Sequence, residues 1–460
     1  MLCRASPAHC HNYDWMYSGL AAWPPHAFSW QAWQALAVAT GAQGVAWVLN
    51  PFAMPPAASV AQLRALAQLG RAGDVFELGN ELYDLNGYAS RIQSVEQYLA
   101  LVQPILQGTA DVPVAKAVVA CPCDMFWAPS AGCWGGGYYQ QWNANLSRTR
   151  TAACATSPVH PLCFDSVTAH NYRLNLADLE AYSASADAMT LAFLTYSEAT
   201  TLNAVERMAA YFPNATLYLT ENNVFYPDGW GNTSSPAASF LRASYHSGLH
   251  ALYVASGLMA ALAHSPLVGS FHYHGLLQGC SKPSGCDPLA SQPGFGIVSL
   301  DTPGQTTVSA VAQVYAHLSA VARQATAVAP VTLSTGPTLN ATFADRPDMP
   351  ALQALAFFMP ANATTLVVLN RWAAAPVQAQ VTGLPPCSSS GSSLTVHTVA
   401  YEAADPGGWA AMPSDPTHFP WPGPLRPTSA TASATVAADG SVSLPPLPAQ
   451  ALYFIELACQ

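Results

Sequence analysis

Polar residues follow three short apolar runs of the sequence, at the point where each run ends. The runs lead into Gly-Asn-Glu at 79–81, His-Asn-Tyr at 170–172 and Glu-Asn-Asn at 221–223. Two glutamates on different strands suit glycoside hydrolysis, in which one carboxyl group protonates the departing oxygen while the other attacks the anomeric carbon or activates water. The acid needs a neutral carboxyl group and its partner an ionised, hydrogen-bonded one. Glu81 and Glu221 are therefore the candidate catalytic pair.

Other polar side chains near these strand ends are candidates for holding a substrate. Asn80 directly precedes the first glutamate and can hydrogen-bond a sugar hydroxyl group, while a His and a Tyr can orient the second glutamate and keep it ionised. His272 and His274 alternate on one face of a later apolar run. No third ligand completes a metal pattern around them, so we interpret them as barrel-lining or substrate contacts. The candidate substrate-binding residues are thus Asn80, His170, Asn171, Tyr172, Tyr226, His272 and His274, with no metal site and no cofactor expected.

Each motif also has an ordinary structural explanation. Asn80 and Glu81 after a strand are typical of a helix start, where Asn caps and an acidic residue interacts favourably with the first turn. The residues 220–223 also suit a polar turn, and His170 alone suits a histidine hydrogen-bonded within the core. Glu96, Glu198 and Glu206 fall in helical patterns and are expected on solvated faces. The sequence around each motif leaves these alternatives open.

The chemistry requires a framework that brings the strand ends together. Short apolar runs predict strands at 44–50, 74–77, 114–119, 164–170, 216–220 and 267–273. Ala- and Leu-rich stretches predict helices at 30–40, 59–70, 94–107, 186–211, 239–263 and 306–325. Near-continuous apolar strands alternating with helices indicate a parallel sheet covered on both faces. Closed into a ring, this is the (β/α)8 TIM barrel, whose active site lies at the carboxyl ends of its strands. A barrel needs eight strands, and the sequence predicts six.

The character of the sequence changes after about residue 327. Pro, Thr, Ser and Ala dominate, and short alternating strands replace the helical patterns, as in LQALAFFM and ALYFIEL. This pattern indicates an all-β sandwich. We therefore predict a partial β/α-barrel catalytic domain at 1–327, with a Cys-rich insertion at 121–163, and a C-terminal β-sandwich domain at 328–460.

The overall composition excludes several classes of partner. The chain of 460 residues is 51% hydrophobic and only 9% charged, with a formal net charge of −10. Lys116 and Lys282 are the only two lysines, and no basic run is present. Nucleic acid is therefore not an expected partner, and a highly sulfated polymer is a poor electrostatic match. No segment is long and apolar enough for a transmembrane helix. We expect a monomer acting on an oligo- or polysaccharide.

Cysteines and glycosylation sequons favour a secreted protein. The chain has 11 cysteines, five of them between residues 121 and 163, and Cys280 and Cys286 form a closely spaced pair. Asn-x-Ser/Thr sequons occur at Asn145, Asn214, Asn232, Asn340 and Asn362. Both features are typical of an oxidising, extracellular or lysosome/vacuole-like setting. The first residues, however, lack the apolar core of a signal peptide, so the sequence predicts either that the protein is not exported or that its true N-terminus precedes Met1. The pairing of the clustered cysteines stays open.

The motifs resemble glycoside hydrolase family 79, the heparanase and plant heparanase-like group, from about residue 30 to the end. FELGNE is similar to the family's acid/base segment, FDSVTAHNY to its sixth-strand segment and LYLTENNVFY to its nucleophile segment. The resemblance implies that Glu81 is the acid/base and Glu221 the nucleophile, with Asn80, His170 and Tyr226 lining the site. It also implies a retaining mechanism, a TIM barrel, a C-terminal sandwich and a bridge between Cys387 and Cys459.

The chain departs from the family pattern at three places. Leu82 stands where the family usually has Pro, which puts the following turn in doubt. Pro-Asp-Gly-Trp-Gly at 227–231 replaces a glycine run that helps to hold a uronate, which weakens the expectation of a β-glucuronide substrate. The family's first two barrel strands and its leader are not found before residue 30, in agreement with the six predicted strands.

The resulting hypothesis is a retaining β-glycosidase of the heparanase or β-glucuronidase type. One alternative is another hydrolase of the same clan, such as an arabinofuranosidase or a glucosylceramidase-like enzyme. A second is a truncated, inactive carbohydrate-binding pseudoenzyme, because incomplete barrels expose strand edges and lack the substrate contacts of the absent strands.

Overall fold

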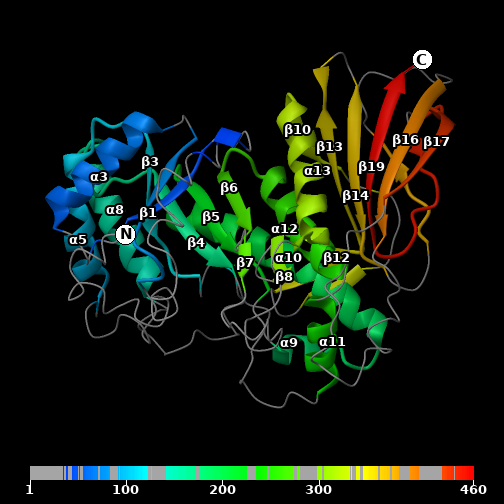
Figure 1. Cartoon of the computed structure of the whole chain (residues 1–460), viewed down its shortest axis with the longest axis horizontal. Helices are drawn as coiled ribbons and strands as arrows, with labels where there is room; N and C mark the ends of the chain where they lie inside the picture. The colour runs from blue at the N-terminus through cyan, green and yellow to red at the C-terminus, as the bar shows by residue number, and fades with distance from the viewer. Residues whose placement is uncertain are drawn as a thin grey trace. The chain divides into compact units, whose positions relative to one another are not determined.

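The structure is a computed structural model of the whole chain (Figure 1). The residues that it describes are 35, 38–39, 44–49, 51, 55–70, 73–82, 92, 94–122, 126, 141–171, 176–224, 235–245, 248–273, 277–279, 298–302, 305–331, 333, 338–341, 345–360, 363–372, 376–382, 393–402, 427–439 and 441–459. Of the predicted helix at 30–40, only residues 35, 38 and 39 fall within this part.

A parallel sheet carries the three polar motifs. Among the described residues it has six strands in the order β1-β2-β3-β4-β5-β6, and pairing is parallel along β1 to β4. The strands are β1 (Ala46–Leu49), β2 (Val75–Leu78), β3 (Ala115–Val119), β4 (Ser166–Asn171), β5 (Thr216–Asn222) and β6 (Val268–Tyr273). The six predicted strands and the predicted fold class are confirmed. Because neighbours in the sheet are also neighbours along the chain, the ends of β2, β4 and β5 fall on the same edge.

Helices α3 (Pro56–Leu69), α5 (Val95–Gly108) and α8 (Trp142–Thr156) follow β1, β2 and β3. Ser94 begins α5 by accepting a hydrogen bond from the Gln97 backbone N–H group. The predicted helices at 59–70 and 94–107 are confirmed within a few residues. Helix α8 was not predicted, because its sequence, WNANLSRTRTAACAT, is polar with a weak apolar stripe.

Five further helices follow β4. They are α9 (Leu176–Glu180), α10 (Ala186–Tyr211), α11 (Pro236–Tyr245), α12 (Gly248–Ala263) and α13 (Ala310–Gln324). The predicted helix at 186–211 is confirmed. The helix predicted at 239–263 corresponds to α11 and α12, and residues 246 and 247 between them lie outside the described part. Nearly every side chain of α12 is buried, so apolar character extends around it. A three-stranded sheet of β7 (Leu277–Gly279), β8 (Val298–Thr302) and β9 (Gln305–Val308) was not predicted.

The C-terminal part is built on an antiparallel sheet in the order β10-β13-β14-β19-β16-β17. Its strands are β10 (Ala327–Pro330), β13 (Leu352–Phe358), β14 (Thr364–Asn370), β16 (Ser393–Glu402), β17 (Thr428–Thr435) and β19 (Ala451–Cys459). One face packs into a core shared with the short pair β15 (Gln380–Val381) and β18 (Val442–Ser443). A second pair joins β11 (Thr338–Ala341) to β12 (Arg346–Pro350). The predicted bounds of the two domains stay a prediction.

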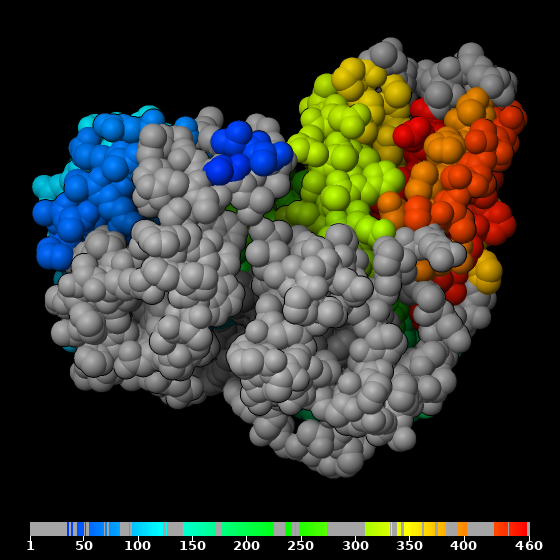
Figure 2. Space-filling view, viewed as in Figure 1, coloured from blue at the N-terminus to red at the C-terminus, as the bar shows by residue number. Residues whose placement is uncertain are grey.

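Strand β17 forms one edge of this sheet and is exposed along almost its whole length (Figure 2). Its sequence, TSATASAT, contains no large apolar side chain. Small polar residues give a neighbouring molecule little apolar surface to bury, which limits edge-to-edge association.

Arg371 is buried in the C-terminal part, directly after the end of β14. Its guanidinium group donates hydrogen bonds to the Glu198 carboxylate at 2.6 Å and to the Pro350 carbonyl oxygen at 2.9 Å. The Glu198 side chain is 13% exposed, so its expected place on a solvated helix face is wrong. Its charge is matched by a cation that lies 173 residues further along the chain, which local sequence patterns do not reveal.

A disulfide bond joins Cys154 in α8 to Cys163. It resolves one pairing within the Cys-rich segment. The candidates Cys280, Cys286 and Cys387 lie outside the described residues, as does the side chain of Cys459. Among the sequon residues, Asn214 and Asn340 are exposed and Asn145 is half-buried within α8, whereas Asn232 and Asn362 lie outside the described part. None of the described helices is long and apolar enough to cross a bilayer.

Candidate active site

The turn after β2 holds Glu81 in an uncommon backbone conformation. Gly79 has φ +109° and Glu81 has φ +48°. The φ of Gly79 is one that residues with a Cβ atom rarely adopt, so glycine is favoured at this position. Left-handed backbone at a non-glycine residue costs energy and is concentrated at functional sites. The polypeptide therefore accepts local strain in the segment that presents Glu81.

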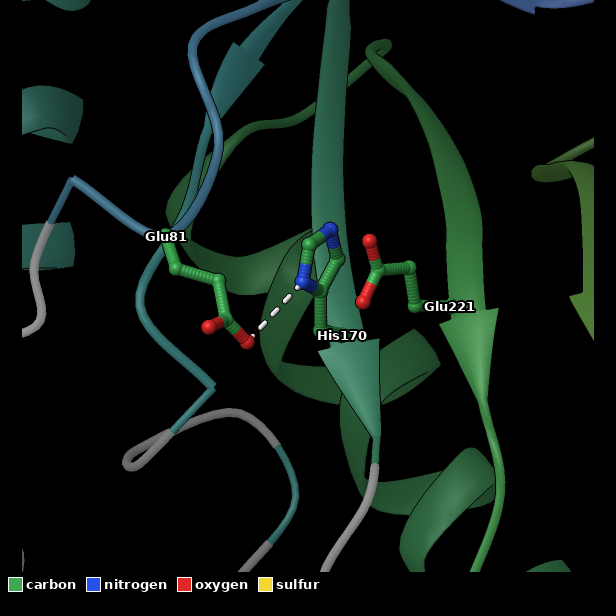
Figure 3. A group of neighbouring side chains, drawn as sticks. All are labelled: Glu81, His170 and Glu221. Carbon is green, nitrogen blue, oxygen red and sulfur yellow. Dashed lines mark hydrogen bonds and ion pairs between the residues drawn. The ribbon is translucent and has the colours of Figure 1, made fainter. Parts of the chain in front are cut away.

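His170, on β4, lies between two carboxylates. Its Nδ1 atom is 3.1 Å from Glu81 Oε1, and its Nε2 atom is 3.2 Å from Glu77 Oε1. The side chains of His170 and Glu77 are 2% and 1% exposed, whereas that of Glu81 is 32% exposed. Figure 3 shows the Glu81 carboxylate directed at the imidazole ring. The row Glu77–His170–Glu81 thus runs from the core of the sheet to a solvent-accessible carboxyl group.

Two threonines complete the surroundings of Glu77. Thr220 Oγ1, on β5, donates a hydrogen bond to Glu77 Oε2 at 2.8 Å. Thr168 Oγ1 lies 2.6 Å from the Thr220 hydroxyl group and 3.4 Å from the same carboxylate oxygen. Because each hydroxyl group has one proton, the short distances fit a chain in which Thr168 donates to Thr220 and Thr220 donates to Glu77. Glu77 Oε2 therefore has a hydroxyl donor, while Oε1 faces a ring nitrogen of His170.

Glu221 directly follows Thr220 at the end of β5 and is half-buried. One oxygen of Glu81, one nitrogen of His170 and one oxygen of Glu221 all lie within 4.8 Å of one another. In Figure 3, Glu221 points toward the ring of His170 from β5. Glu81, His170 and Glu221, which the sequence places at three separate strand ends, are thus brought together.

Tyr98, buried on α5, hydrogen-bonds to the backbone of β2 and β3. Its hydroxyl group donates to the Leu78 carbonyl oxygen and accepts from the Val119 N–H group, both at 2.9 Å. Burial is the main reason that the pKa of Tyr98 is raised; the hydrogen bond from Val119 opposes this, and the charge of Glu77 adds to it. Tyr98 therefore stays neutral and ties β2 and β3 to α5.

Three other predicted site residues lie within the described part of the chain: Asn80, Asn171 and His272. Asn80 is half-buried in the turn. Asn171 is buried, and its side chain donates to Thr200 Oγ1 at 3.1 Å, so its amide is engaged within the protein. His272 is half-buried on β6, and its carbonyl oxygen accepts from Asn222. The predicted residues Tyr172, Tyr226 and His274 lie outside the described part of the chain.

Sequence reasoning missed Glu77, Thr168 and Thr220. Glu77 was read as part of an apolar strand, and the threonines as ordinary strand formers. A signal was present: Thr168 and His170 are two apart on β4, and alternate residues of a strand share a face. An acidic residue inside a strand that is otherwise apolar needs a buried partner, and this was the clue to Glu77.

Two carboxylates and one imidazole lie together at the site, and side chains of these types bind divalent cations in proteins. Glu81, His170 and Glu221 each offer one ligand atom, and imidazole with carboxylate suits zinc and other transition metals. A pair of carboxyl groups such as Glu81 and Glu221 is also the arrangement that glycoside hydrolysis uses without a metal. Comparing activity before and after treatment with a chelator distinguishes the two uses.

The fold was compared with known proteins. No sequence-family model matches the chain, and no curated protein does. Among solved structures, the chain is similar to the GH51 arabinofuranosidase from Xanthomonas axonopodis pv. citri, with 14% identity, TM-score 0.59 and coverage of 94% of this chain and 79% of that one. It is also similar to the α-L-arabinofuranosidase from Thermotoga maritima in complex with arabinose, with 12% identity, TM-score 0.53 and the same coverage, 94% and 79%. At this identity the likeness concerns the fold: a parallel sheet resembling part of a TIM barrel, followed by an antiparallel β domain.

Proposed function

We propose that the chain is a glycoside hydrolase that cleaves O-glycosidic bonds with retention of configuration. The observation that carries the proposal is the meeting of Glu81 and Glu221, from the ends of β2 and β5, beside the buried His170. The fold similarity to arabinofuranosidases supports it, since their common framework places active sites at the carboxyl ends of barrel strands.

The two glutamates differ in the roles that they take. Glu81 protonates the glycosidic oxygen as the bond to the anomeric carbon breaks, while Glu221 attacks that carbon and forms a glycosyl-enzyme intermediate. Glu81 then removes a proton from water, which attacks the same carbon and releases Glu221. Asn80 directly precedes Glu81 and is proposed to bind a sugar hydroxyl group.

The spacing of the carboxyl groups supports retention. Retaining enzymes have carboxyl groups ~5–5.5 Å apart, and inverting enzymes ~6.5–9.5 Å apart to admit water. One oxygen of Glu81 and one of Glu221 lie within 4.8 Å, close to the smaller separation. Analysis of the first-formed anomer by ¹H NMR tests this: retention is expected, and an inverted product contradicts the mechanism.

Two classes of sugar are candidates. The resemblance to family 79 favours a β-glucuronide on a weakly charged glycan, since the net charge of −10 disfavours a highly sulfated polymer. The fold similarity favours an α-L-arabinofuranoside. The class is decided by hydrolysis rates on a panel of 4-nitrophenyl glycosides containing both sugars, β-glucosides and β-galactosides.

The proposed setting is extracellular or within a lysosome- or vacuole-like compartment. The Cys154–Cys163 disulfide and the two exposed sequon asparagines, Asn214 and Asn340, support it. A monomer that requires no metal or other cofactor completes the proposal. Unchanged activity after EDTA treatment is expected, whereas loss of activity with recovery on adding zinc contradicts the metal-free mechanism.

The rival proposal is a carbohydrate-binding protein without activity. It predicts that no glycoside of the panel is hydrolysed, while oligosaccharides still bind in calorimetric titrations. The hydrolase proposal predicts turnover that the Glu221→Gln substitution abolishes. Calorimetry and rate measurements on one preparation therefore separate the two.

A further inference from the structure

The Glu77 carboxylate belongs to the site but takes no part in the two-glutamate mechanism. It lies within β2, where its side chain is only 1% exposed. Burying a carboxylate is costly unless hydrogen bonds compensate. Here Oε2 accepts from Thr220 at 2.8 Å, and Oε1 lies 3.2 Å from His170 Nε2. A carboxylate held in this way, one imidazole ring away from the proposed acid, calls for a functional explanation.

Proton counting limits the states of this row. An ionised Glu77 can only accept, so His170 Nε2 must carry a proton. The contact of 3.1 Å between Nδ1 and Glu81 Oε1 also needs one proton, since two lone pairs would otherwise face each other. That proton belongs either to a neutral Glu81 carboxyl group, which donates to Nδ1, or to a doubly protonated His170. In both states the Glu81–His170 contact retains the proton that acid catalysis uses.

A neutral Glu77 would permit the opposite arrangement. It could donate to Nε2, and a neutral His170 would then carry its proton on Nδ1 and donate it to an ionised Glu81. Glu81 would then have lost the proton that the departing oxygen requires. The charge of Glu77 therefore decides which tautomer of His170 faces Glu81.

We propose that Glu77 is a positioning residue for the proposed hydrolysis, which fixes His170 in its Nε2–H form so that Nδ1 holds the acid proton of Glu81. The inference rests on the proposed function for its catalytic consequence. Its structural part, the tautomer of His170, is measurable on the protein itself without any substrate.

The charge of Glu77 also affects the pH dependence of the reaction. Three carboxyl groups lie near His170: Glu77 on β2, Glu81 after β2 and Glu221 on β5. Tyr98 on α5, whose pKa is raised by burial and by the charge of Glu77, is neutral and adds no charge to this row. Removing one negative charge weakens proton retention by the His170–Glu81 pair, and the basic limb of the pH–rate profile should move to lower pH by on the order of one unit.

The kinetic test uses Glu77→Gln, which keeps the shape of the side chain and removes its charge. On an alkyl glycoside, whose leaving group needs protonation, kcat/KM should fall on the order of 10- to 100-fold, a part of the 10²–10⁴-fold contribution of acid catalysis. On a 4-nitrophenyl glycoside of the same sugar the fall should be smaller, and the basic limb should shift as described. Glu198→Gln is the matched control: it neutralises another mostly buried glutamate, outside the site, and should leave both profiles unchanged.

The second test records ¹⁵N chemical shifts of the imidazole rings, with His170 assigned by comparison with His170→Gln. Wild type should show a protonated Nε2, and Glu77→Gln should show a mixture of tautomers. A wild-type ring protonated on Nδ1 alone overturns the proposal, even if Glu77→Gln does not fold. An active wild type with an unshifted pH profile in Glu77→Gln overturns it as well.

The two proposals fail in different ways. If wild type hydrolyses no glycoside of the panel, the proposed function fails and the imidazole spectra alone judge the role of Glu77. If wild type is active and the spectra or profiles are insensitive to Glu77, the proposed function stands and the positioning role fails.

Discussion

Two buried acid–base pairs, in different parts of the chain, show how differently a protein can use charge. Glu77 and His170 lie in the parallel sheet with side chains 1% and 2% exposed. Arg371, which directly follows β14, and Glu198, in α10, have side chains 0% and 13% exposed. Burial alone does not distinguish them. The difference is that His170 contacts a second carboxylate, Glu81, which is 32% exposed, so the first pair is connected to a group that substrate and solvent can reach.

The chemistry of the cations adds to the contrast. A guanidinium group does not exchange its proton under working conditions, so the contact of Arg371 with Glu198 relays no proton and serves packing. Histidine changes its protonation near neutral pH and has two distinct nitrogens. A buried charged pair therefore points to catalysis when it can exchange protons and ends at an accessible group. The substitutions below test this distinction.

The largest effect is expected from Glu221→Gln. Without the proposed nucleophile no glycosyl-enzyme intermediate forms, and kcat should fall by roughly four orders of magnitude or more, or about 5 kcal/mol in the barrier. The free energy of unfolding, measured by urea denaturation, should change by less than about 1 kcal/mol because Glu221 is only half-buried. An active Glu221→Gln enzyme would contradict its assignment as the nucleophile.

The next effect concerns stability rather than activity. Arg371→Met leaves Glu198 without its cation and should lower the free energy of unfolding by about 3–5 kcal/mol. The folded fraction should keep the wild-type kcat. The double substitution Arg371→Met with Glu198→Leu should recover most of the loss, since apolar pairs of similar volume replace buried ion pairs well. A fall in kcat would contradict the separation of the two pairs.

A smaller effect is expected from Thr220→Val, which removes the donor to Glu77 and keeps the shape. Loss of one hydrogen bond to a buried carboxylate should cost about 1–3 kcal/mol of stability. Thr201→Val is the matched control, because Thr201 is also buried and its hydroxyl group has no hydrogen-bond partner among the described residues. It should be neutral or stabilising in the same denaturation experiment. Equal losses in the two variants would show that the contact with Glu77 contributes nothing.

The same contrast explains what the sequence could and could not predict. Glu81, His170 and Glu221 were recognisable because each follows an apolar strand, and strand ends of a parallel sheet meet at one edge. Glu77 and Arg371 were missed because each is satisfied by partners far away in the chain, at sequence separations of 93 and 173 residues for His170 and Glu198. Local patterns report periodicity, whereas buried polar partners are determined by tertiary packing.

The smallest effect is expected at Asp178, a carboxyl group whose pKa is raised by burial. Desolvation raises the pKa of Asp178, on α9, from 3.8 to about 6. The folded state then prefers the protonated form: below pH 3.8 both states are protonated and there is no penalty, whereas above about pH 6 both are ionised and the penalty is complete. Asp178→Asn, which is neutral throughout, should therefore gain stability relative to wild type as pH rises from about 4 to about 6, and keep that gain at higher pH.

The gain from Asp178→Asn should stay below about 1 kcal/mol, because the side chain is partly exposed and solvent screens its charge. Urea denaturation at pH 4 and pH 7.5 measures it, and an equal difference at both values would contradict the shift. If the shift is present and the pH–rate profile of the variant matches that of wild type, then a displaced pKa is not in itself a mark of the active site. What marks the active site is the connection of Glu77 and His170 to an accessible acid, which Asp178 and the Arg371–Glu198 pair both lack in the described structure.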